Sequence, residues 1–289
     1  IFIIYSIIRS FFFLLLNRPK ILVGMGGYAS LPICIAAIIL RIKFVIYENN
    51  LIVGKANKLL APFAGKILVS NKDVEGIPIK YNKKTLEIGN IIKKEFLSFS
   101  KNSINTEDKK LNILVLGGSQ AAKIFADILP KLFKKCSQLG ISLKIYQHCL
   151  PDQSEHLKEF YSKENIEFET FNFTKNLEKY LSKVSLAITR SGSSVLAELT
   201  NANIPFISVP LPSSADNHQF KNALFYERKN FAFLIEENDL NEKLVNLIQE
   251  IYHDHSKLNK IIESQKEYSD KNVYDNINKV ITELINEKN

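Results

Sequence analysis

Short apolar runs alternate with longer stretches of helical spacing along this chain. Runs rich in β-branched residues lie at residues 21–23, 43–47, 66–70, 111–116, 142–147, 167–170, 186–189, 205–209 and 231–235. Helical spacing fills most of the intervals between them. Short strands that alternate with helices are typical of parallel α/β sheets, so the pattern predicts two α/β blocks.

A polar stretch at residues 98–110 separates these blocks. We therefore predict a first domain at residues 1–105, a second at 106–265, and a C-terminal helical segment at 266–289 that packs back on the first domain. The first block is short for a doubly wound domain, and residue 1 is Ile rather than Met. We expect leading βα units upstream of residue 1, so that the first domain is truncated at its N-terminus.

The most apolar stretch of the chain is its start, residues 1–16. It is shorter than the about 20 residues that span a bilayer, and Arg9 lies in its middle. Two interpretations stay open: a helix buried in the core, and a helix that lies on a membrane surface.

Charge bears on this choice. The chain is 46% hydrophobic and 24% charged, which excludes a disordered protein. Its formal net charge is +8; residues 1–108 hold 15 Lys and Arg against 7 Asp and Glu, and the remainder is balanced. The positive excess accompanies an apolar helix and not base-stacking aromatics in a basic groove. This pattern is not typical of a nucleic-acid-binding protein, and Arg9, Arg18 and Lys20 beside the apolar stretch suit an anionic membrane surface as a partner, while the buried core helix stays open.

Cysteine and acidic residues indicate no metal site. Cys34, Cys136 and Cys149 are scattered without metal-binding spacing, which is typical of reduced thiols in a cytoplasmic protein. No D-x-D sequence follows a predicted strand. We expect neither a metal ion nor another cofactor.

Two loops that follow strands of the second block suit a phosphate. Gly117, Gly118, Ser119 and Gln120 lie between a strand and a helix, where free amides can donate to an anion. The third glycine and the later acidic residue of a dinucleotide site are absent, which argues against a nicotinamide dehydrogenase. A tight turn without a ligand is the alternative.

The second such loop holds Ser191, Gly192 and Ser193, and the helix after it carries Glu198. A carboxylate there could accept hydrogen bonds from both hydroxyls of a ribose while the loop amides hold a phosphate. The alternative is an N-capped helix with a surface glutamate.

Further along, Asp216, Asn217, His218, Gln219 and Asn222 cluster at a predicted helix start. Carboxamides paired with an aspartate suit sugar hydroxyls, which need donors and acceptors. A polar helix start capped by Asp216 is the alternative.

The first block has comparable loops at its strand ends. Gly26, Gly27 and Tyr28 follow the first strand, and Glu48 and Asn50 follow the second. Carboxyl ends of parallel strands share one edge of a sheet, so we expect these loops to face a common crevice.

Taken in order and spacing, six motifs resemble the MurG family of peptidoglycan glycosyltransferases along residues 1–265. They are Gly24–Tyr28, Glu48–Asn50 with Gly54 and Asn57, Gly89-Asn90, Gly117–Gln120, Arg190–Gly192 with Glu198, and Asp216–Gln219 with Asn222-Ala223. The resemblance implies two Rossmann-like parallel-sheet domains in a GT-B architecture. It implies a metal-independent, inverting transfer of N-acetylglucosamine from UDP-N-acetylglucosamine to lipid I, the undecaprenyl-linked muramyl-pentapeptide, which gives lipid II. It also implies a peripheral location on the cytoplasmic face of the bacterial inner membrane, with residues 1–16 as the docking helix.

The resemblance further implies roles for single residues. Glu198 would hold the ribose, and Asp216 and Gln219 would face the sugar with support from Asn222. The residues expected at the diphosphate, the uracil or elsewhere on the donor are Asn50, Lys93, Ser119, Gln120, Thr174, Ser191, Gly192 and Ser193. Gly26, Gly27 and Tyr28 would belong to the acceptor side.

Three departures from the family pattern limit these implications. Tyr47 stands where the family usually has a histidine, and Lys93 stands where it usually has an arginine, which keeps the charge but loses the bidentate fork. The family's glycine-rich loop with the histidine often proposed as catalytic would lie upstream of residue 1. We therefore assign no base; His218 is the one histidine within a site motif. Two alternatives remain: a truncated UDP-sugar-binding protein without turnover, and a related lipid glycosyltransferase with another acceptor.

Overall fold

The computed structural model describes residues 2–104, 109–117, 119–172 and 177–286. The chain forms two compact units. Unit 1 comprises Ile1–Ile91 together with Asp270–Asn289, and unit 2 comprises Ile92–Ser269.

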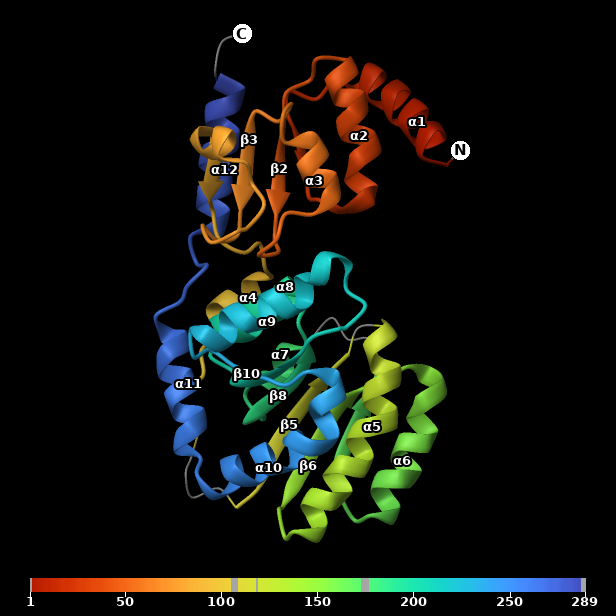
Figure 1. Ribbon diagram of the computed structural model, residues 1–289, viewed down its shortest axis with the longest axis vertical. Coiled ribbons are helices and arrows are strands. Elements are labelled where there is room, and N and C mark those ends of the chain that lie inside the picture. The colour runs from red at the N-terminus through yellow and green to blue at the C-terminus, as the bar shows by residue number, and fades with distance from the viewer. Residues whose placement is uncertain (1, 105–108, 118, 173–176, 287–289) are drawn as a thin grey trace. The chain divides into compact units, whose positions relative to one another are not determined.

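Unit 1 is built on a four-stranded parallel sheet in the order β1-β2-β3-β4. Its elements in chain order are α1 (Phe2–Asn17), β1 (Leu22–Gly24), α2 (Gly27–Ile39), β2 (Phe44–Glu48), α3 (Lys55–Leu60), β3 (Lys66–Val69), a 3-10 helix (Ile79–Lys84), β4 (Thr85–Glu87) and, from the end of the chain, α12 (Val273–Asn286). The predicted strands of the first block are present, and β4 adds one that the pattern did not predict. In Figure 1, α12 returns beside β3, and Leu284 of α12 lies next to Gly65.

Unit 2 holds a six-stranded parallel sheet in the order β10-β9-β8-β5-β6-β7. Its strands are β5 (Leu111–Leu116), β6 (Leu143–His148), β7 (Glu167–Phe171), β8 (Leu186–Arg190), β9 (Phe206–Val209) and β10 (Phe233–Leu234). Its helices are α4 (Lys94–Ser98), α5 (Ser119–Gln138), α6 (Ser154–Lys163), α7 (Glu178–Leu181), α8 (Ser193–Asn201), α9 (His218–Arg228), α10 (Leu240–His253) and α11 (Ser256–Lys266), with 3-10 turns at Pro151–Gln153, Ala215–Asn217 and Glu237–Asp239. Apolar clusters cover both faces of the sheet, as a parallel sheet requires.

The boundaries between the units differ from the predicted ones. We predicted that the first domain ends at residue 105, but the chain leaves unit 1 at Ile91. Ile92 and Phe96 are buried in an apolar cluster of unit 2, so packing draws the polar stretch after them into that unit. The chain returns to unit 1 at Asp270, four residues after α11 ends.

Helix α1 exposes most of its apolar side chains. Of its described residues only Leu14 is buried, whereas Phe2 is 87% exposed and Leu16 84% exposed. The helix lies along α2 (Figure 1), and Leu14 joins the apolar cluster of unit 1. Within residues 2–286, α1 is thus a surface helix rather than the core helix of the first interpretation. Within the described part of the chain, no helix combines the length and hydropathy needed to cross a membrane.

Candidate functional site

The strand order of unit 2 places its candidate site. Strand β5 has β6 on one side and β8 on the other, so successive connections run in opposite directions from β5. Ligands of open parallel sheets bind at the carboxyl ends of the strands where the order reverses. The two predicted phosphate loops follow β5 and β8, which are neighbours. The side chains of Ser119 and Gln120, and Thr174 as a whole, lie outside the described residues.

The loop after β8 is fixed at Ser191. Its N–H donates to Oε1 of Gln219 at 3.2 Å, and its carbonyl accepts from Nδ2 of Asn222 at 3.1 Å. Ser191 is fully buried, and its hydroxyl bonds that of Ser208 at 2.7 Å. The Ser191 hydroxyl is thus engaged within the unit, while Gly192 and Ser193 stay partly exposed at the start of α8.

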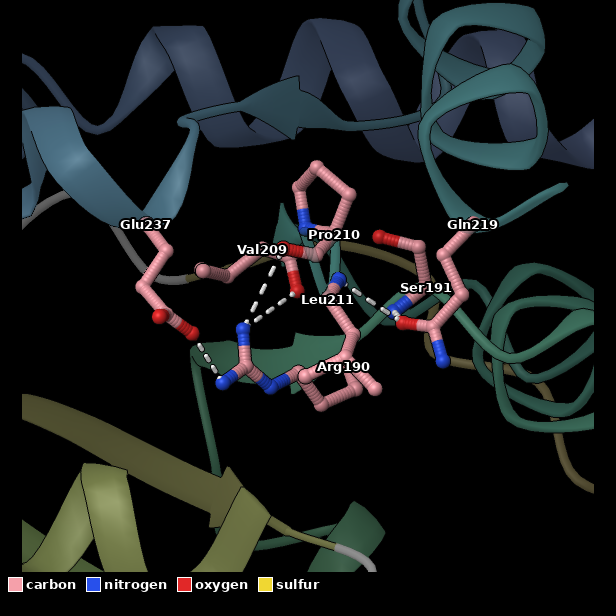
Figure 2. Close-up of polar contacts among 7 residues, drawn as sticks. All are labelled: Arg190, Ser191, Val209, Pro210, Leu211, Gln219 and Glu237. Carbon is pink, nitrogen blue, oxygen red and sulfur yellow. Dashed lines mark hydrogen bonds and ion pairs between the residues drawn. The ribbon is translucent and has the colours of Figure 1, made fainter. Parts of the chain in front are cut away.

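Gln219 joins two loops, as Figure 2 shows. Its Oε1 accepts from Ser191 N and from Leu211 N, the latter at 3.0 Å. Its amide nitrogen points away from both donors in the figure. The oxygen of Gln219 therefore binds the two loops, and only its Nε2 group could donate to a sugar. That Gln219 faces a sugar stays a prediction. Asn222 is buried and supports Ser191, which is the supporting position that the resemblance implied.

Arg190 holds the end of the neighbouring strand β9. Its guanidinium donates to the carbonyl of Val209 at 3.4 Å and of Pro210 at 3.2 Å, and it forms an ion pair with Glu237 (Figure 2). The guanidinium also lies over the ring of Phe125, 4.9 Å from its centroid. Arg190 is buried, and its terminal guanidinium nitrogens bind these partners, so it holds the ends of β8 and β9 together.

Glu198 on α8 is a partly buried carboxylate whose oxygens accept no hydrogen bond from the described residues. Burial raises its pKa to about 7, with Lys93 acting to lower it and Glu95 to raise it. An open, partly desolvated carboxylate of this kind suits a ligand that brings its own hydroxyl donors.

The Asp216 motif forms a strained turn ahead of α9. Asp216 and Asn217 are both left-handed, with φ of 51° and 54°, a conformation that Asp and Asn tolerate better than most residues. Asp216 is exposed, and Asn217 is the N-cap of α9 without a side-chain capping bond. The alternative of Asp216 as a helix cap is therefore wrong. The Nδ1 group of His218 donates to the Ala215 carbonyl at 2.8 Å, so the imidazole ring binds the turn that precedes α9.

In unit 1 the carboxylate of Glu48 is hydrogen-bonded at both oxygens. Glu48 accepts from the N–H groups of Asn50 and Gly54 and from the side-chain amides of Asn50 and Asn57, at 2.9–3.2 Å. Asn50, which we expected at the donor, thus binds Glu48. Gly26 has a φ of +78°, and a Cβ there would lie 3.2 Å from the Asn57 amide nitrogen. Gly26 after β1 therefore lies close to the end of β2 and to α3, and Gly27 and Tyr28 are exposed.

Tyr47, at the position of the family's histidine, is a structural residue here. Its buried hydroxyl accepts from Ile91 N at 3.1 Å and lies 2.9 Å from Oδ1 of Asn49 and 3.1 Å from the Gly89 carbonyl. Burial raises the pKa of Tyr47, so the hydroxyl stays protonated. Asn90, beside Gly89, donates from its backbone to buried Asp270 at 2.8 Å.

Several of these supporting residues were not predicted. Glu237, Ser208 and Asp270 were missed because each meets a partner distant in sequence. His148 was also missed: burial lowers its pKa, and a hydrogen bond to the Gly117 backbone acts in the opposite direction. The one feature of the sequence that could have indicated His148 is its position at the end of β6, the strand that pairs with β5.

Comparison with known proteins identifies the family. Residues 2–69 match the glycosyltransferase family 28 N-terminal domain, and residues 112–280 match the glycosyltransferase family 28 C-terminal domain. The chain belongs to glycosyltransferase family 28. Within family 28 it is of the MurG type that the six motifs indicated.

Family 28 relatives cover nearly the whole chain. A Pelagibacter ubique protein named UDP-N-acetylglucosamine–N-acetylmuramyl-(pentapeptide) pyrophosphoryl-undecaprenol N-acetylglucosamine transferase is 35% identical over 99% of this chain and 80% of its own length. A protein of the same name from Francisella philomiragia is 33% identical over 95% of this chain and 76% of its own length.

Solved structures share the fold. MurG of Acinetobacter baumannii has a TM-score of 0.78 at 23% identity and covers 97% of this chain and 80% of its own. The Staphylococcus aureus MnaA–UDP structure has a TM-score of 0.70 at 17% identity and covers 99% and 81%. The predicted GT-B class with two parallel-sheet α/β domains is confirmed.

Proposed function

We propose that this family 28 chain transfers N-acetylglucosamine from UDP-N-acetylglucosamine to the undecaprenyl-pyrophosphoryl N-acetylmuramyl-pentapeptide, lipid I, and so forms lipid II. The names of the relatives supply the donor and acceptor classes. The observation that carries the proposal is Glu198, an open carboxylate on the helix that follows the loop of β8. It supports a donor site in unit 2.

The donor would bind through groups of this unit. Two ribose hydroxyls would donate to Glu198, and the diphosphate would lie at the loops after β5 and β8, where the N-terminus of α8 offers backbone amides. Lys93 is close enough to Glu198 to lower its pKa and would add positive charge beside the diphosphate. Ser193 and Gly192 are the open part of the loop, because Ser191 is already engaged.

The reaction would be a direct displacement with inversion. The acceptor's 4-hydroxyl oxygen forms a bond to the anomeric carbon, the bond from that carbon to the diphosphate oxygen breaks, and UDP leaves with the electron pair. The hydroxyl proton passes to a base, which we do not assign to a residue of this chain. Backbone amides aimed at the leaving diphosphate stabilise its developing charge without a metal ion in this proposal.

The membrane side of the proposal rests on α1. Its exposed aromatic and aliphatic side chains, together with the positive excess of residues 1–108, suit the surface of an anionic bilayer. We place the protein at the cytoplasmic face of the inner membrane, where the undecaprenyl-linked acceptor would be met. Gly26, Gly27 and Tyr28 would belong to the acceptor side.

The test pairs Glu198→Ala with Glu159→Ala, an exposed carboxylate on α6 of the same unit. Removing two charge-assisted hydrogen bonds should weaken UDP-N-acetylglucosamine binding by about 10- to 100-fold, measured by titration calorimetry, while the control stays within about twofold of the unsubstituted chain. Equal affinity in all three proteins would overturn the donor site.

Turnover separates the remaining alternatives. Transfer of radiolabelled N-acetylglucosamine to lipid I, with the product identified by mass, supports the proposed reaction. Donor binding without product from any acceptor would identify a UDP-sugar-binding protein, and product only with another lipid-linked acceptor would identify a related transferase.

A further inference from the structure

Unit 1 carries a cationic pocket at the sheet edge opposite the loops described above. The pocket has a volume of about 370 Å³, within the range of small-ligand sites. Arg18 and Lys20 reach it from the end of α1, and Arg41 reaches it from the end of α2. The other lining residues are Pro19, Leu40, Ile42, Lys43, Leu284 and Ile285. No acidic residue is among these lining residues.

The backbone at both arginines is unusual. Arg18 has a φ of 33° and Arg41 a φ of 54°, in the left-handed region that favours glycine and asparagine. Elsewhere the chain uses those residues for the same purpose. The positions that follow α5, α6, α8 and α9 in this conformation are Gly140, Asn165, Asn203 and Asn230.

The turn at Arg41 is the same as at those four positions, whereas Pro19 has no N–H that could close such a turn after Arg18. Ile42 N donates to the Ala37 carbonyl at 2.9 Å after α2, as Ile141 N donates to the Cys136 carbonyl at 3.1 Å after α5. A requirement for the turn alone therefore does not explain an arginine at the left-handed position. Arginine occurs at the two turns that line the pocket, which points to a role for the guanidinium groups.

Neutralisation of the helix ends is a weaker explanation. Helices α6 and α9 carry Lys163 and Arg228 in their last turns and still end in Asn at the left-handed position. A cation can thus meet the helix dipole from an unstrained position. Moreover, within the described ranges Arg18, Lys20 and Arg41 take part in no ion pair.

We propose that this pocket binds a phosphate or diphosphate group. Two guanidinium groups offer planar forks that match phosphate oxygens, and Lys20 adds a third positive charge. The group could belong to a lipid headgroup or to a soluble phosphate. The lipid source rests on the proposed membrane location, and it suits the exposed apolar side chains beside the pocket, Leu16, Ile39 and Ile285.

The test uses Arg18→Asn with Arg41→Asn, because asparagine adopts the left-handed turn and the fold is expected to keep or gain thermal stability. The control is Lys72→Gln with Lys83→Gln, which removes the same charge from exposed positions of unit 1. One arm measures flotation with phosphatidylcholine vesicles with and without phosphatidylglycerol. The other measures binding of inorganic pyrophosphate by calorimetry without lipid.

The expected result is a loss of about 10- to 30-fold in at least one arm for the arginine pair and about twofold or less for the lysine pair. A loss confined to the vesicle arm assigns a lipid headgroup, and a loss confined to the pyrophosphate arm assigns a soluble phosphate. Equal effects of both pairs, or no loss in either arm, overturn the pocket as a phosphate site.

Two further measurements separate loss of the phosphate site from loss of folding and from failure of the proposed transferase function. Arg18→Lys with Arg41→Lys keeps the charge without the fork and should give an intermediate loss; it also replaces the Asn pair if that pair fails to fold. Transfer to a water-soluble acceptor analogue should be unchanged in both arginine pairs. Absence of transfer in the unsubstituted chain would contradict the proposed function and leave the pocket result valid.

Discussion

Glu48 and Glu198 lie in comparable places of the two units but have opposite surroundings. Glu48 is the last residue of β2 and Glu198 lies in α8 after β8, yet Glu48 accepts four hydrogen bonds from Asn50, Gly54 and Asn57. Glu198 has burial but no donor among the described residues, and its pKa rises to about 7 as a result. The difference teaches that an acidic residue in a motif is a candidate for ligand binding only when its carboxylate oxygens are not already hydrogen-bonded within the protein.

Removal of the saturated carboxylate should have the largest effect. Glu48→Ala leaves two backbone N–H groups and two side-chain amides without their acceptor, so we expect a loss of about 3–5 kcal/mol in the free energy of unfolding of unit 1. Urea unfolding monitored by hydrogen exchange of β2 and α3 measures it. A loss below about 1 kcal/mol, the scale of a surface substitution, would contradict the contrast with Glu198.

The buried ion pair of unit 2 should come next. Glu237→Met leaves the Arg190 guanidinium with two carbonyls and no counter-charge, and should destabilise unit 2 by about 2–4 kcal/mol. Arg190→Met combined with Glu237→Met removes both charges and should recover most of that loss. If the double variant is as unstable as the single one, packing and not charge explains the effect.

Binding of the donor should depend on pH through Glu198. Its pKa near 7 means that the accepting carboxylate is mostly protonated at pH 6, so UDP-N-acetylglucosamine should bind about tenfold more weakly at pH 6 than at pH 8. The sugar nucleotide is the right probe because its diphosphate diester does not titrate in this range. Glu198→Gln should flatten the profile, and a persistent slope in that variant would assign the dependence to another group.

Glu198 should also make the free energy of unfolding depend on pH, and here a rise in pH should lower stability whereas it strengthens donor binding. Folding raises the pKa of this carboxyl. At a pH below its ordinary pKa the group is neutral in both the folded and the unfolded state, so it does not affect stability. At higher pH the unfolded state ionises first, which lowers the free energy of unfolding. The unliganded chain should therefore lose about 1–3 kcal/mol relative to Glu198→Gln as pH rises from 4.5 to 7, then stay constant. Thermal unfolding of the two proteins at matched pH measures the difference.

The smallest expected effect concerns Lys93. It is exposed and lowers the pKa of Glu198, so Lys93→Gln should raise the midpoint of the binding profile by less than about half a pH unit. Lys94→Gln, at the adjacent exposed lysine, is the matched control, because Lys93 and Glu95 are the charges that shift the pKa of Glu198. A downward shift would contradict the assigned contact.

Local pattern was enough for much of the fold and for part of the site. Apolar runs located nine of the described strands, and the loops after β5 and β8 could be named because carboxyl ends of parallel strands are where ligands bind. Glu198 was found from its place after a loop of small residues. These features depend on neighbours in sequence.

The supporting residues could not be predicted in this way. Arg190 and Glu237 are 47 positions apart, and Asn90 and Asp270 are 180 apart. Sequence spacing says nothing about such pairs, because sheet order and helix packing bring them together. The same limit explains why Asn50 was expected at the donor although Glu48 holds its side chain.

The divided composition of unit 1 has a consequence for biosynthesis. Residues 1–91 of unit 1 emerge before unit 2, but Asp270 and α12, which contact Gly89 and Asn90, emerge only after it. At ribosomal rates of 5–20 residues per second, unit 1 must wait about 10–40 s for its final helix, whereas unit 2 is continuous and can fold first. During that interval the part of unit 1 that α12 covers, including Gly65, is open to chaperones, so the emergence of α12 limits when unit 1 can complete its fold.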